Sequence, residues 1–321
     1  MNSVSLREKA GDIVERCAVL AGLLEVSGYP KPGNVHRTRD LADTRFEHFL
    51  AGSVAIGPAM RTLAQSGYDA GMSRLDIGKI GLGSQILRAA QDSLSWQRGG
   101  NVNLGIILLL APLAAASGLY LSEMRQVDLL QLRRSLDRVT KAATPEDAVA
   151  IYKAIRASVP KRVLGRVEEL DVTDDASLAK IVDEGLTPLH IFEECRDRDS
   201  ICNEWVNNFS VTFTIGYPTL KEAFQQSEDI NTAVVHTFLH ILAKIPDSLI
   251  ERKSGQQAAS KVSGMAAEAL EKGGLTKPEG KRAILKMDET LHRAGGTLNP
   301  GTTADVTTAS LYLLLFEGWR P

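Results

Sequence analysis

The stretch from Val102 to Leu121 reads VNLGIILLLAPLAAASGLYL and contains no charged residue. A helix of this length and hydropathy is long enough to cross a membrane. However, Pro112 and many small residues occupy its middle, no aromatic belt flanks it, and no second span returns the chain. We therefore predict a helix that is buried on all sides in a large helical domain, with no attachment to a membrane.

Apolar residues recur at helical spacing on both sides of this segment. In the first segment Leu6, Cys17 and Leu24 share one face. This helix is expected to end near Ser27, before the glycines and prolines of residues 28–33. Further helices are expected at about 45–67, 73–96, 102–120, 123–141, 145–157, 187–209, 219–243, 246–272, 280–294 and 302–317.

Two stretches do not follow the helical pattern. Val211 to Ile215 alternates as a short strand would, but one strand forms no sheet. Residues 158–186 are more charged and less periodic, as in an insertion or a mobile connection. No tandem repeat or clear linker divides the chain. The pattern predicts an all-α fold in which residues 1–321 form a single large multi-helix domain around a buried apolar central helix.

Composition excludes some classes of partner. The chain has 37 basic and 39 acidic residues and a net charge of -2. We therefore expect no broad attraction to nucleic acid or anionic lipid, and any phosphate-binding surface must be local. Cys17, Cys195 and Cys202 are too few and too scattered for a disulfide framework. The N-terminal segment carries charges where a signal peptide needs apolar residues. The few cysteines and this segment together favour a cytoplasmic protein.

The first polar motif follows the N-terminal helix, and residues 25–40 read EVSGYPKPGNVHRTRD. Glu25 should lie in the last helical turn, where the helix dipole disfavours an anion by about 0.3–1 kcal/mol. Lys31 or a bound Mg²⁺ could supply the cation that this placement requires, and Arg37 and Arg39 could hold phosphate oxygens. A solvated charged turn is the alternative for any one residue. The candidate site residues here are Glu25, Lys31, Gly33, Asn34, His36, Arg37 and Asp40, and the motif continues to Asp43 and Glu47.

A second polar motif, GGNVNLG at residues 99–105, directly precedes the apolar helix. Asn101 suits an N-cap, and the glycines let a ligand approach the free N–H groups at the helix start. Asn103 enters an apolar helix as a second polar residue and needs a partner, either a ligand or another buried polar group. Asn101 and Asn103 are therefore candidate ligand-binding residues, with capping alone as the alternative for Asn101.

A third polar motif, GGTLNPGTTAD at residues 295–305, leads into the final helix. A glycine-rich turn at a helix N-terminus suits a phosphate, but Asp305 would repel one. Mg²⁺ shared between Asp305 and phosphate oxygens resolves this conflict, since the ion prefers one or two carboxylates plus substrate. An acidic residue that only complements the helix dipole is the alternative. Asn299, Gly301 and Thr302 are the candidate ligand contacts of this motif.

A fourth, weaker patch reads PDSLIERK at residues 246–253. Proline followed by Asp247 and Ser248 is ordinary chemistry for the start of a helix. Arg252 and Lys253 could reach a phosphate, but they are expected to form a solvated basic turn.

In their order, these motifs resemble those of the triphosphoribosyl-dephospho-CoA synthase family. That family has a glutamate followed by K-P-G near the N-terminus, an asparagine-containing turn before an apolar helix, and N-P-G-x-x-A-D near the C-terminus. The matching stretches here are Glu25 with Lys31-Pro32-Gly33, the turn 101–105, and residues 299–305. The last match is the most specific, and with the first it brackets nearly the entire chain. Residues 199–207 and 246–250 also look like those of archaeal-type members.

The resemblance implies an all-helical, Mg²⁺-dependent transferase that moves the triphosphoribosyl group of ATP to the 2'-hydroxyl of dephospho-CoA and releases adenine. The implied roles are metal or ribose binding for Glu25 and Asp305, triphosphate contact for Lys31 and Arg37, ligand orientation for Asn101 and Asn299, and general base or second metal ligand for Asp40.

The chain also departs from the better-known synthases, which carry a G-A-H-x-D-M-type segment after K-P-G and His-Lys-Gly in the central turn. Here these stretches read HRTRD at 36–40 and NLG at 103–105. ATP or a related phosphoribosyl nucleotide is expected as the donor, and dephospho-CoA or another small molecule, such as an intermediate of a pterin-type one-carbon carrier, as the acceptor. A phosphotransferase, an N-glycosidic hydrolase and a non-catalytic nucleotide-binding protein are the alternatives. The apolar surface of so many helices is consistent with a homodimer.

Overall fold

The computed structural model describes residues 3–124, 126–159, 171–172 and 174–321. Every regular element in these ranges is helical, which confirms the expected all-α fold. The α-helices are α1 (Ser3–Ser27), α2 (Phe46–Ala55), α3 (Gly57–Gly71), α4 (Leu82–Ser95), α5 (Leu104–Glu123), α6 (Leu129–Ala142), α7 (Pro145–Ser158), α9 (Asp175–Asp183), α10 (Pro188–Glu193), α11 (Ser200–Val206), α12 (Tyr217–Ser227), α13 (Ile230–Lys244), α14 (Ser248–Ser254), α15 (Gln256–Glu271), α16 (Pro278–His292) and α17 (Gly301–Glu317).

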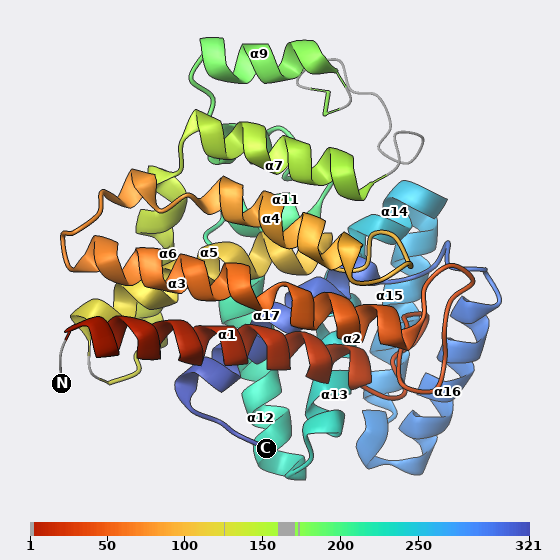
Figure 1. Ribbon diagram of the computed structural model, residues 1–321. Coiled ribbons are helices and arrows are strands. Elements are labelled where there is room, and N and C mark those ends of the chain that lie inside the picture. Colours follow the sequence, from red (N-terminus) through yellow and green to blue (C-terminus); the bar gives the residue numbers. More distant parts are fainter. Residues whose placement is uncertain (1–2, 125, 160–170, 173) are drawn as a thin grey trace.

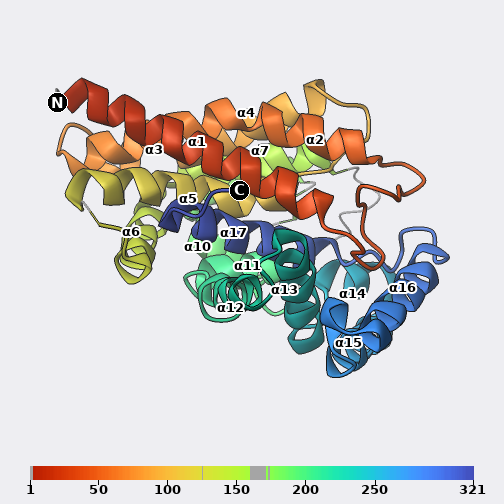
Figure 2. The same cartoon turned by 90° about the horizontal axis from the view of Figure 1, so that it is seen from below.

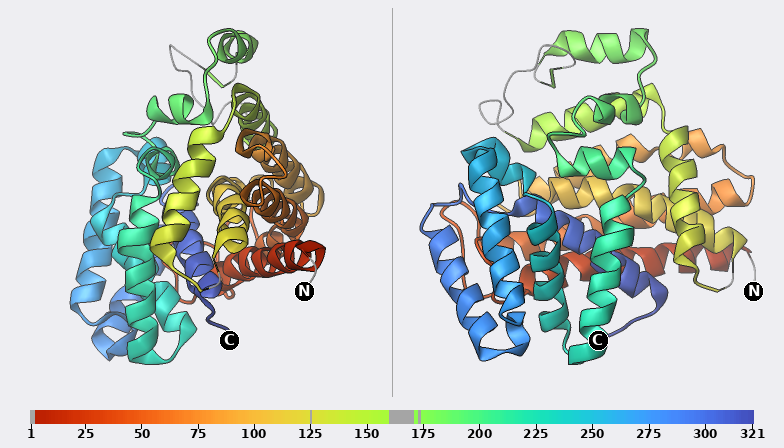
Figure 3. Two further views of the ribbon diagram at one scale, coloured as in Figure 1. Left: turned by 90° about the vertical axis from the view of Figure 1, so that its left-hand side faces the viewer. Right: turned by 180° about the vertical axis from the view of Figure 1, so that it is seen from behind.

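The helices pack in layers around α5 and α17. Figure 1 shows α1, α3, α4, α7 and α9 following one another across one face. Figure 2 shows α5 and α17 in the middle, with α6 and α10 to α13 on the side opposite α1. At one end α14, α15 and α16 pack with α13 around a second apolar cluster, and they form a distinct group in both views of Figure 3. The loop 28–45 runs from the end of α1 along this group.

Helix α5 is the buried central helix that the sequence predicts. It is apolar enough to cross a membrane, with a mean hydropathy of 2.1, but 89% of its apolar window is buried inside the fold. Its small residues permit close packing on α3. A Cβ added at Gly118 would lie 1.9 Å from the Ala64 carbonyl oxygen, and one at Gly67 would lie 2.0 Å from that of Ala115. The two backbones are therefore in direct contact.

Pro112 sits inside α5 and has no N–H to donate to the carbonyl of Leu108, one turn earlier. The indole Nε1 of Trp205, on α11, donates to that carbonyl at 3.0 Å. Trp205 is fully buried. A side chain from a distant segment thus satisfies the acceptor that proline leaves free, which is why the central helix tolerates a proline in its interior.

The expected strand at Val211 to Ile215 is wrong. Residues Thr212–Gly216 form a short π-helix that leads into α12. The buried carboxylate of Glu204 accepts hydrogen bonds from the N–H groups of Val211 at 2.8 Å and Thr212 at 2.9 Å. The alternating pattern therefore reflects a turn capped by a distant carboxylate and not an extended chain. The single helices expected at 45–67, 187–209, 219–243 and 246–272 are each divided into two by a turn.

The cysteines also differ from expectation. Cys195 and Cys202 form a disulfide with a Cα–Cα distance of 5.8 Å, within the usual range for such a bond. The turn between α10 and α11 brings them together, a proximity that seven residues of separation do not reveal in the sequence. Cys17 is free and buried. Of the charged region 158–186, residues 175–183 form α9, whereas 160–170 lie outside the described residues.

We predict that replacing Trp205 by Phe destabilises the chain by about 1–3 kcal/mol, because the Leu108 carbonyl loses its donor while it stays buried. Replacing Pro112 by Ala supplies a backbone N–H for the same carbonyl. The cost of W205F should therefore be smaller, by about 1 kcal/mol, in a P112A background. Urea unfolding of the four chains measures this coupling. Equal costs of W205F in both backgrounds would show that packing alone explains Trp205.

Candidate functional site

Glu25 and Lys31 form a buried ion pair at the end of α1. The Nζ of Lys31 donates to the backbone carbonyl of Glu25 at 3.0 Å and also to its carboxylate. The Lys31 side chain is 0% exposed and that of Glu25 2%. Burial raises the pKa of Glu25 and lowers that of Lys31, while each charge partly offsets the effect on the other. Lys31 thus caps the C-terminal end of α1 and supplies the cation expected beside Glu25.

Asp305, in the second turn of α17, contributes to the same charged centre. Its carboxylate lies against Gly105 at the start of α5, where an added Cβ would come within 2.0 Å of Oδ2. Burial raises the pKa of Asp305 well above its ordinary value, and the charges of Glu25, Asp247 and Asp199 raise it further. The charge of Asp305 in turn raises the pKa of Lys31. The structure therefore brings the acidic residues of the first and last motifs together.

Asp247 links two helices at this centre. Its carboxylate caps α14 through the N–H groups of Leu249 (2.9 Å) and Ile250 (3.2 Å). The other oxygen accepts from the N–H and the hydroxyl of Thr303, both at 2.7 Å, and so joins α14 to α17. The helix-opening role expected of residue 247 is confirmed, but the sequence offered no sign of the bond to Thr303, which lies 56 positions away.

The K-P-G loop and the N-P-G turn are bonded directly. Asn34 donates its side-chain N–H to the side-chain oxygen of Asn299 at 2.9 Å. Gly33 has a φ of +72°, and a Cβ there would lie 2.7 Å from that of Leu291. Gly301 approaches Leu249 almost as closely, since its added Cβ would be 2.7 Å from a methyl carbon. Glycine is needed at Gly33, where φ is positive and the neighbour is a Cβ, whereas at Gly301 the Leu249 methyl would have to shift to admit a larger residue.

The two asparagines of the central turn have separate partners. Asn101 is exposed and accepts from the N–H of Leu104 at 3.1 Å, as a helix cap. Asn103 is buried. With its amide oriented to satisfy both neighbours, it accepts from the Ser53 N–H and donates to the Val102 carbonyl, both at 2.9 Å. Asn103 thus finds the second of the two partners expected for it, a buried polar group.

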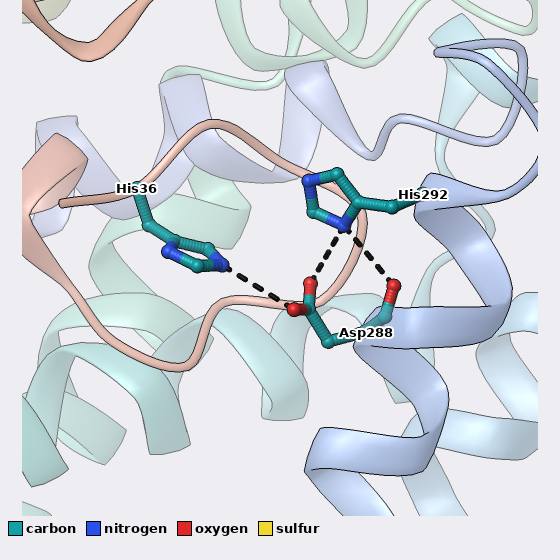
Figure 4. Close-up of side chains that lie close together, drawn as sticks. All are labelled: His36, Asp288 and His292. Carbon is teal, nitrogen blue, oxygen red and sulfur yellow. Dashed lines mark hydrogen bonds and ion pairs between the residues drawn. The ribbon is translucent and has the colours of Figure 1, made fainter. Parts of the chain in front are cut away.

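Three candidates from the first motif lie outside this charged centre. Arg37 is exposed and donates to the Ser27 carbonyl at 2.6 Å. Asp40 is exposed and accepts from the N–H of Phe46 at the start of α2, at 2.9 Å. His36 is buried against α16 and faces Asp288 (Figure 4). The loop therefore turns its polar residues in three directions, which spacing along the sequence could not reveal.

A small cavity lies on the Asp247 side of the centre. It measures about 20 Å³ and is lined by Asp247, Thr302 and Thr303 among other residues, which is room for roughly one water molecule. The turn 295–301 before α17 is held by hydrogen bonds from Lys253 to the Gly296 carbonyl and from Ser254 to that of Thr297, each 3.2 Å.

The fold and the site together define an all-α protein whose charged centre is built from both ends of the chain and from the start of its central helix. The model of the family "CitG: ATP:dephospho-CoA triphosphoribosyl transferase" matches residues 12–321. The chain belongs to this family of transferases.

Relatives from bacteria and an archaeon share nearly the whole length of the chain. A 2-(5''-triphosphoribosyl)-3'-dephosphocoenzyme-A synthase of Escherichia fergusonii is 23% identical, over 98% of this chain and 94% of its own. A Streptococcus equi subsp. equi protein given the same name is 25% identical over 97% and 99%. The crystal structure of an Archaeoglobus fulgidus protein, assigned as a triphosphoribosyl-dephospho-CoA synthase, superposes with a TM-score of 0.62 at 25% identity, covering 86% of this chain and 100% of that one.

We predict that Asp305→Asn stabilises the chain in the absence of divalent ions. A raised folded-state pKa means that ionisation of Asp305 opposes folding. The loss of stability is absent below the ordinary carboxyl pKa of about 4. It grows as the pH rises toward the pKa of Asp305 in the folded chain. The gain should be on the order of 1 kcal/mol at pH 8 and should shrink toward pH 4.5. Urea unfolding at both pH values measures it, with Asp92→Asn, at a partly exposed position of α4, as the control. A gain that does not depend on pH would contradict the explanation.

Proposed function

We propose that the chain transfers the triphosphoribosyl group of ATP to the 2'-hydroxyl of dephospho-CoA, with release of adenine, at the centre formed by Glu25, Lys31 and Asp305. Family membership over residues 12–321 supports the reaction. The observation that carries the site is that Asp305, packed on Gly105, is near enough to the buried pair of Glu25 and Lys31 for Glu25 to raise the pKa of Asp305 and for Asp305 to raise that of Lys31.

Mg²⁺ fits the acidic residues of this centre. Besides burial, the charges of Glu25, Asp199 and Asp247 raise the pKa of Asp305, and that of Arg252 lowers it. Arg252 is paired with Asp199, and Asp247 accepts four hydrogen bonds from backbone and hydroxyl donors. Lys31 bonds one carboxylate oxygen of Glu25, Oε1. Asp305 and the other carboxylate oxygen of Glu25 are therefore the ligands that would hold the ion, and the ion would supply positive charge for the triphosphate.

The residues of the chain also suit the chemistry at the ribose. Loss of adenine leaves positive charge on C1, which a nearby carboxylate stabilises. The acceptor hydroxyl also needs a base. We assign this role to a carboxylate of the buried centre in preference to Asp40, which lies on the exposed loop. Lys31 holds Glu25 in place and does not itself contact the substrate.

We propose that the turn 295–301, which is held by few side-chain bonds, opens to admit the nucleotide. Gly301 and Thr302 begin α17, so their N–H groups and the positive end of the helix dipole would then face the phosphates. Thr302 is buried and bonded to the hydroxyl of Ser248 at 3.2 Å, which places it beside Asp247. The same movement would release the contacts of Lys253 and Ser254 to the turn.

The activity test is incubation of the purified chain with ATP, Mg²⁺ and dephospho-CoA, followed by chromatography of the products. We expect free adenine and a triphosphoribosylated acceptor. Glu25→Gln and Asp305→Asn should each lower the rate by at least about 100-fold, since they remove transition-state charge stabilisation. Asp92→Asn, at a partly exposed position of α4 outside the centre, is the matched control.

The products distinguish the competing reactions. ADP would indicate phosphoryl transfer, and adenine with free ribosyl triphosphate would indicate hydrolysis. If adenine is released only with an acceptor other than dephospho-CoA, the proposed ATP site is retained and the proposed acceptor is replaced. Full activity of both E25Q and D305N would reject the proposed site.

Metal binding has its own expected result. Mg²⁺ should raise the melting temperature of the chain, because an ion that binds only the folded state stabilises it by mass action. The shift should be largely lost in D305N, although that variant is the more stable one without the ion. Thermal scans over a Mg²⁺ titration provide the measurement, and equal shifts in both chains would place the ion elsewhere.

A further inference from the structure

The cations of the first motif each have a partner within the fold. Lys31 is buried in its pair with Glu25. Arg37 donates to a backbone carbonyl at the end of α1, and Arg39 pairs with Glu289 on α16. A triphosphate carries more negative charge than one Mg²⁺ ion offsets, so its recognition also calls for cationic side chains. These cations must come from another segment of the chain.

Helix α14 carries two adjacent cations, Arg252 and Lys253, and lies against the start of α17. At its beginning, Asp247 bonds the N–H and the hydroxyl of Thr303 on α17, both at 2.7 Å. At its end, the Nζ of Lys253 donates to a backbone carbonyl of the turn 295–301 at 3.2 Å. The helix thus borders both the start of α17 and the turn that we propose opens for the nucleotide.

Arg252 is held at the edge of the charged centre by Asp199. Its Nη1 pairs with Oδ2 of Asp199, while the other carboxylate oxygen caps α11 by accepting from a backbone N–H at 2.8 Å. The disulfide between Cys195 and Cys202 closes the loop that contains Asp199. Burial and the neighbouring carboxylates raise the pKa of Asp305, and the charge of Arg252 opposes them. The guanidinium group therefore lies within electrostatic reach of the centre.

Both cations retain donors for a ligand. The side chain of Arg252 is 46% exposed, and among the residues that the structure describes only its Nη1 has a partner. Its Nε and Nη2 groups therefore remain available. Lys253 has three N–H donors and uses one on the Gly296 carbonyl. Arg252 is directed toward α11 and Lys253 toward the turn, so the two would contact different phosphate groups.

We propose that Arg252 and Lys253 bind the triphosphate group of the nucleotide beside the carboxylates of the charged centre. The inference rests on the proposed function and deepens it, because it assigns the triphosphate to α14 instead of to the loop 28–45. Lys253 exchanges the Gly296 carbonyl for a phosphate oxygen when the turn opens. Arg252 keeps its bond to Asp199 and donates its remaining N–H groups, in the forked geometry that suits phosphate.

The test is calorimetric titration of the full chain with inorganic tripolyphosphate in the presence of Mg²⁺. This probe carries three phosphates without ribose or adenine, so its binding requires no turnover. We expect saturable binding to the parent chain. Arg252→Gln and Lys253→Gln should each weaken it at least about 10-fold, because each loses a hydrogen bond between charged groups. With ATP as substrate, both variants should raise KM more than they lower kcat.

Arg138→Gln is the matched control. Arg138 pairs with Glu123 at 2.9 Å and is 52% exposed, so its surroundings resemble those of Arg252. It lies on α6, at the end of the molecule away from α14 (Figures 1 and 3). Tripolyphosphate binding should be unchanged in R138Q. Circular dichroism checks that all three variants are folded.

Three results would overturn the proposal. R252Q and K253Q could both bind tripolyphosphate as the parent does, or the folded parent could bind none. Tighter binding by K253Q would also overturn it, because a lysine that only holds the turn closed would let the turn open more readily once removed. Failure of the proposed reaction gives a different result, in which the parent binds tripolyphosphate through these residues but releases no adenine from ATP.

Discussion

The buried ion pair of Glu25 and Lys31 fixes the point at which α1 ends and the loop 28–45 begins. Two fully buried charges are expensive to desolvate, and their attraction offsets that cost only when the geometry is good and further hydrogen bonds are made. Lys31 meets this condition by bonding both the carboxylate and the backbone carbonyl of Glu25. Because Lys31 must return to the end of α1, Gly33, Asn34 and His36 are directed outward onto α16 and the turn before α17.

The same pair sets the charge of the centre. Lys31 offsets Glu25, so Asp305 adds a carboxylate that no cation of the described residues bonds directly. A neutral residue at position 305 would make the folded chain more stable. Functional sites commonly keep charges that oppose folding, and Asp305 is such a charge. Gly105 also leaves room for the carboxylate of Asp305, because a larger residue at 105 would force that carboxylate away. Sequence, packing and charge all favour a cation shared with a ligand at this point.

Periodicity predicted most of the fold because helices are local structures. The N-terminal helix, the buried helix with Pro112 and the final helix agree with their expected ranges to within a few residues. The errors occur where side chains seven or eight residues away decide the backbone. Glu204 turns an alternating stretch into a π-helix, and the turn before α11 pairs two cysteines that spacing alone did not connect. No local pattern contains this information.

The sequence likewise predicted part of the candidate site and missed the rest. The motifs identified the segments that meet, including the contact between Asn34 and Asn299, but not which side chains turn inward. Asp288 and His292 stand four positions apart in a predicted helix, a spacing that places both on one face, yet nothing near them in sequence marks their partner. His36 becomes that partner only because Lys31 fixes the loop.

The loop 28–45 thus joins the charged centre to α16. Lys31 bonds Glu25 at the end of α1, whereas Gly33 and His36 both contact the carboxylate of Asp288 on α16. His292, one turn further along α16, donates to the same carboxylate and so holds it in place. None of these contacts involves the turn 295–301, so the turn can open while Lys31 keeps its position. The rigid and the moving parts of the proposed site are thus assigned to different segments of the chain.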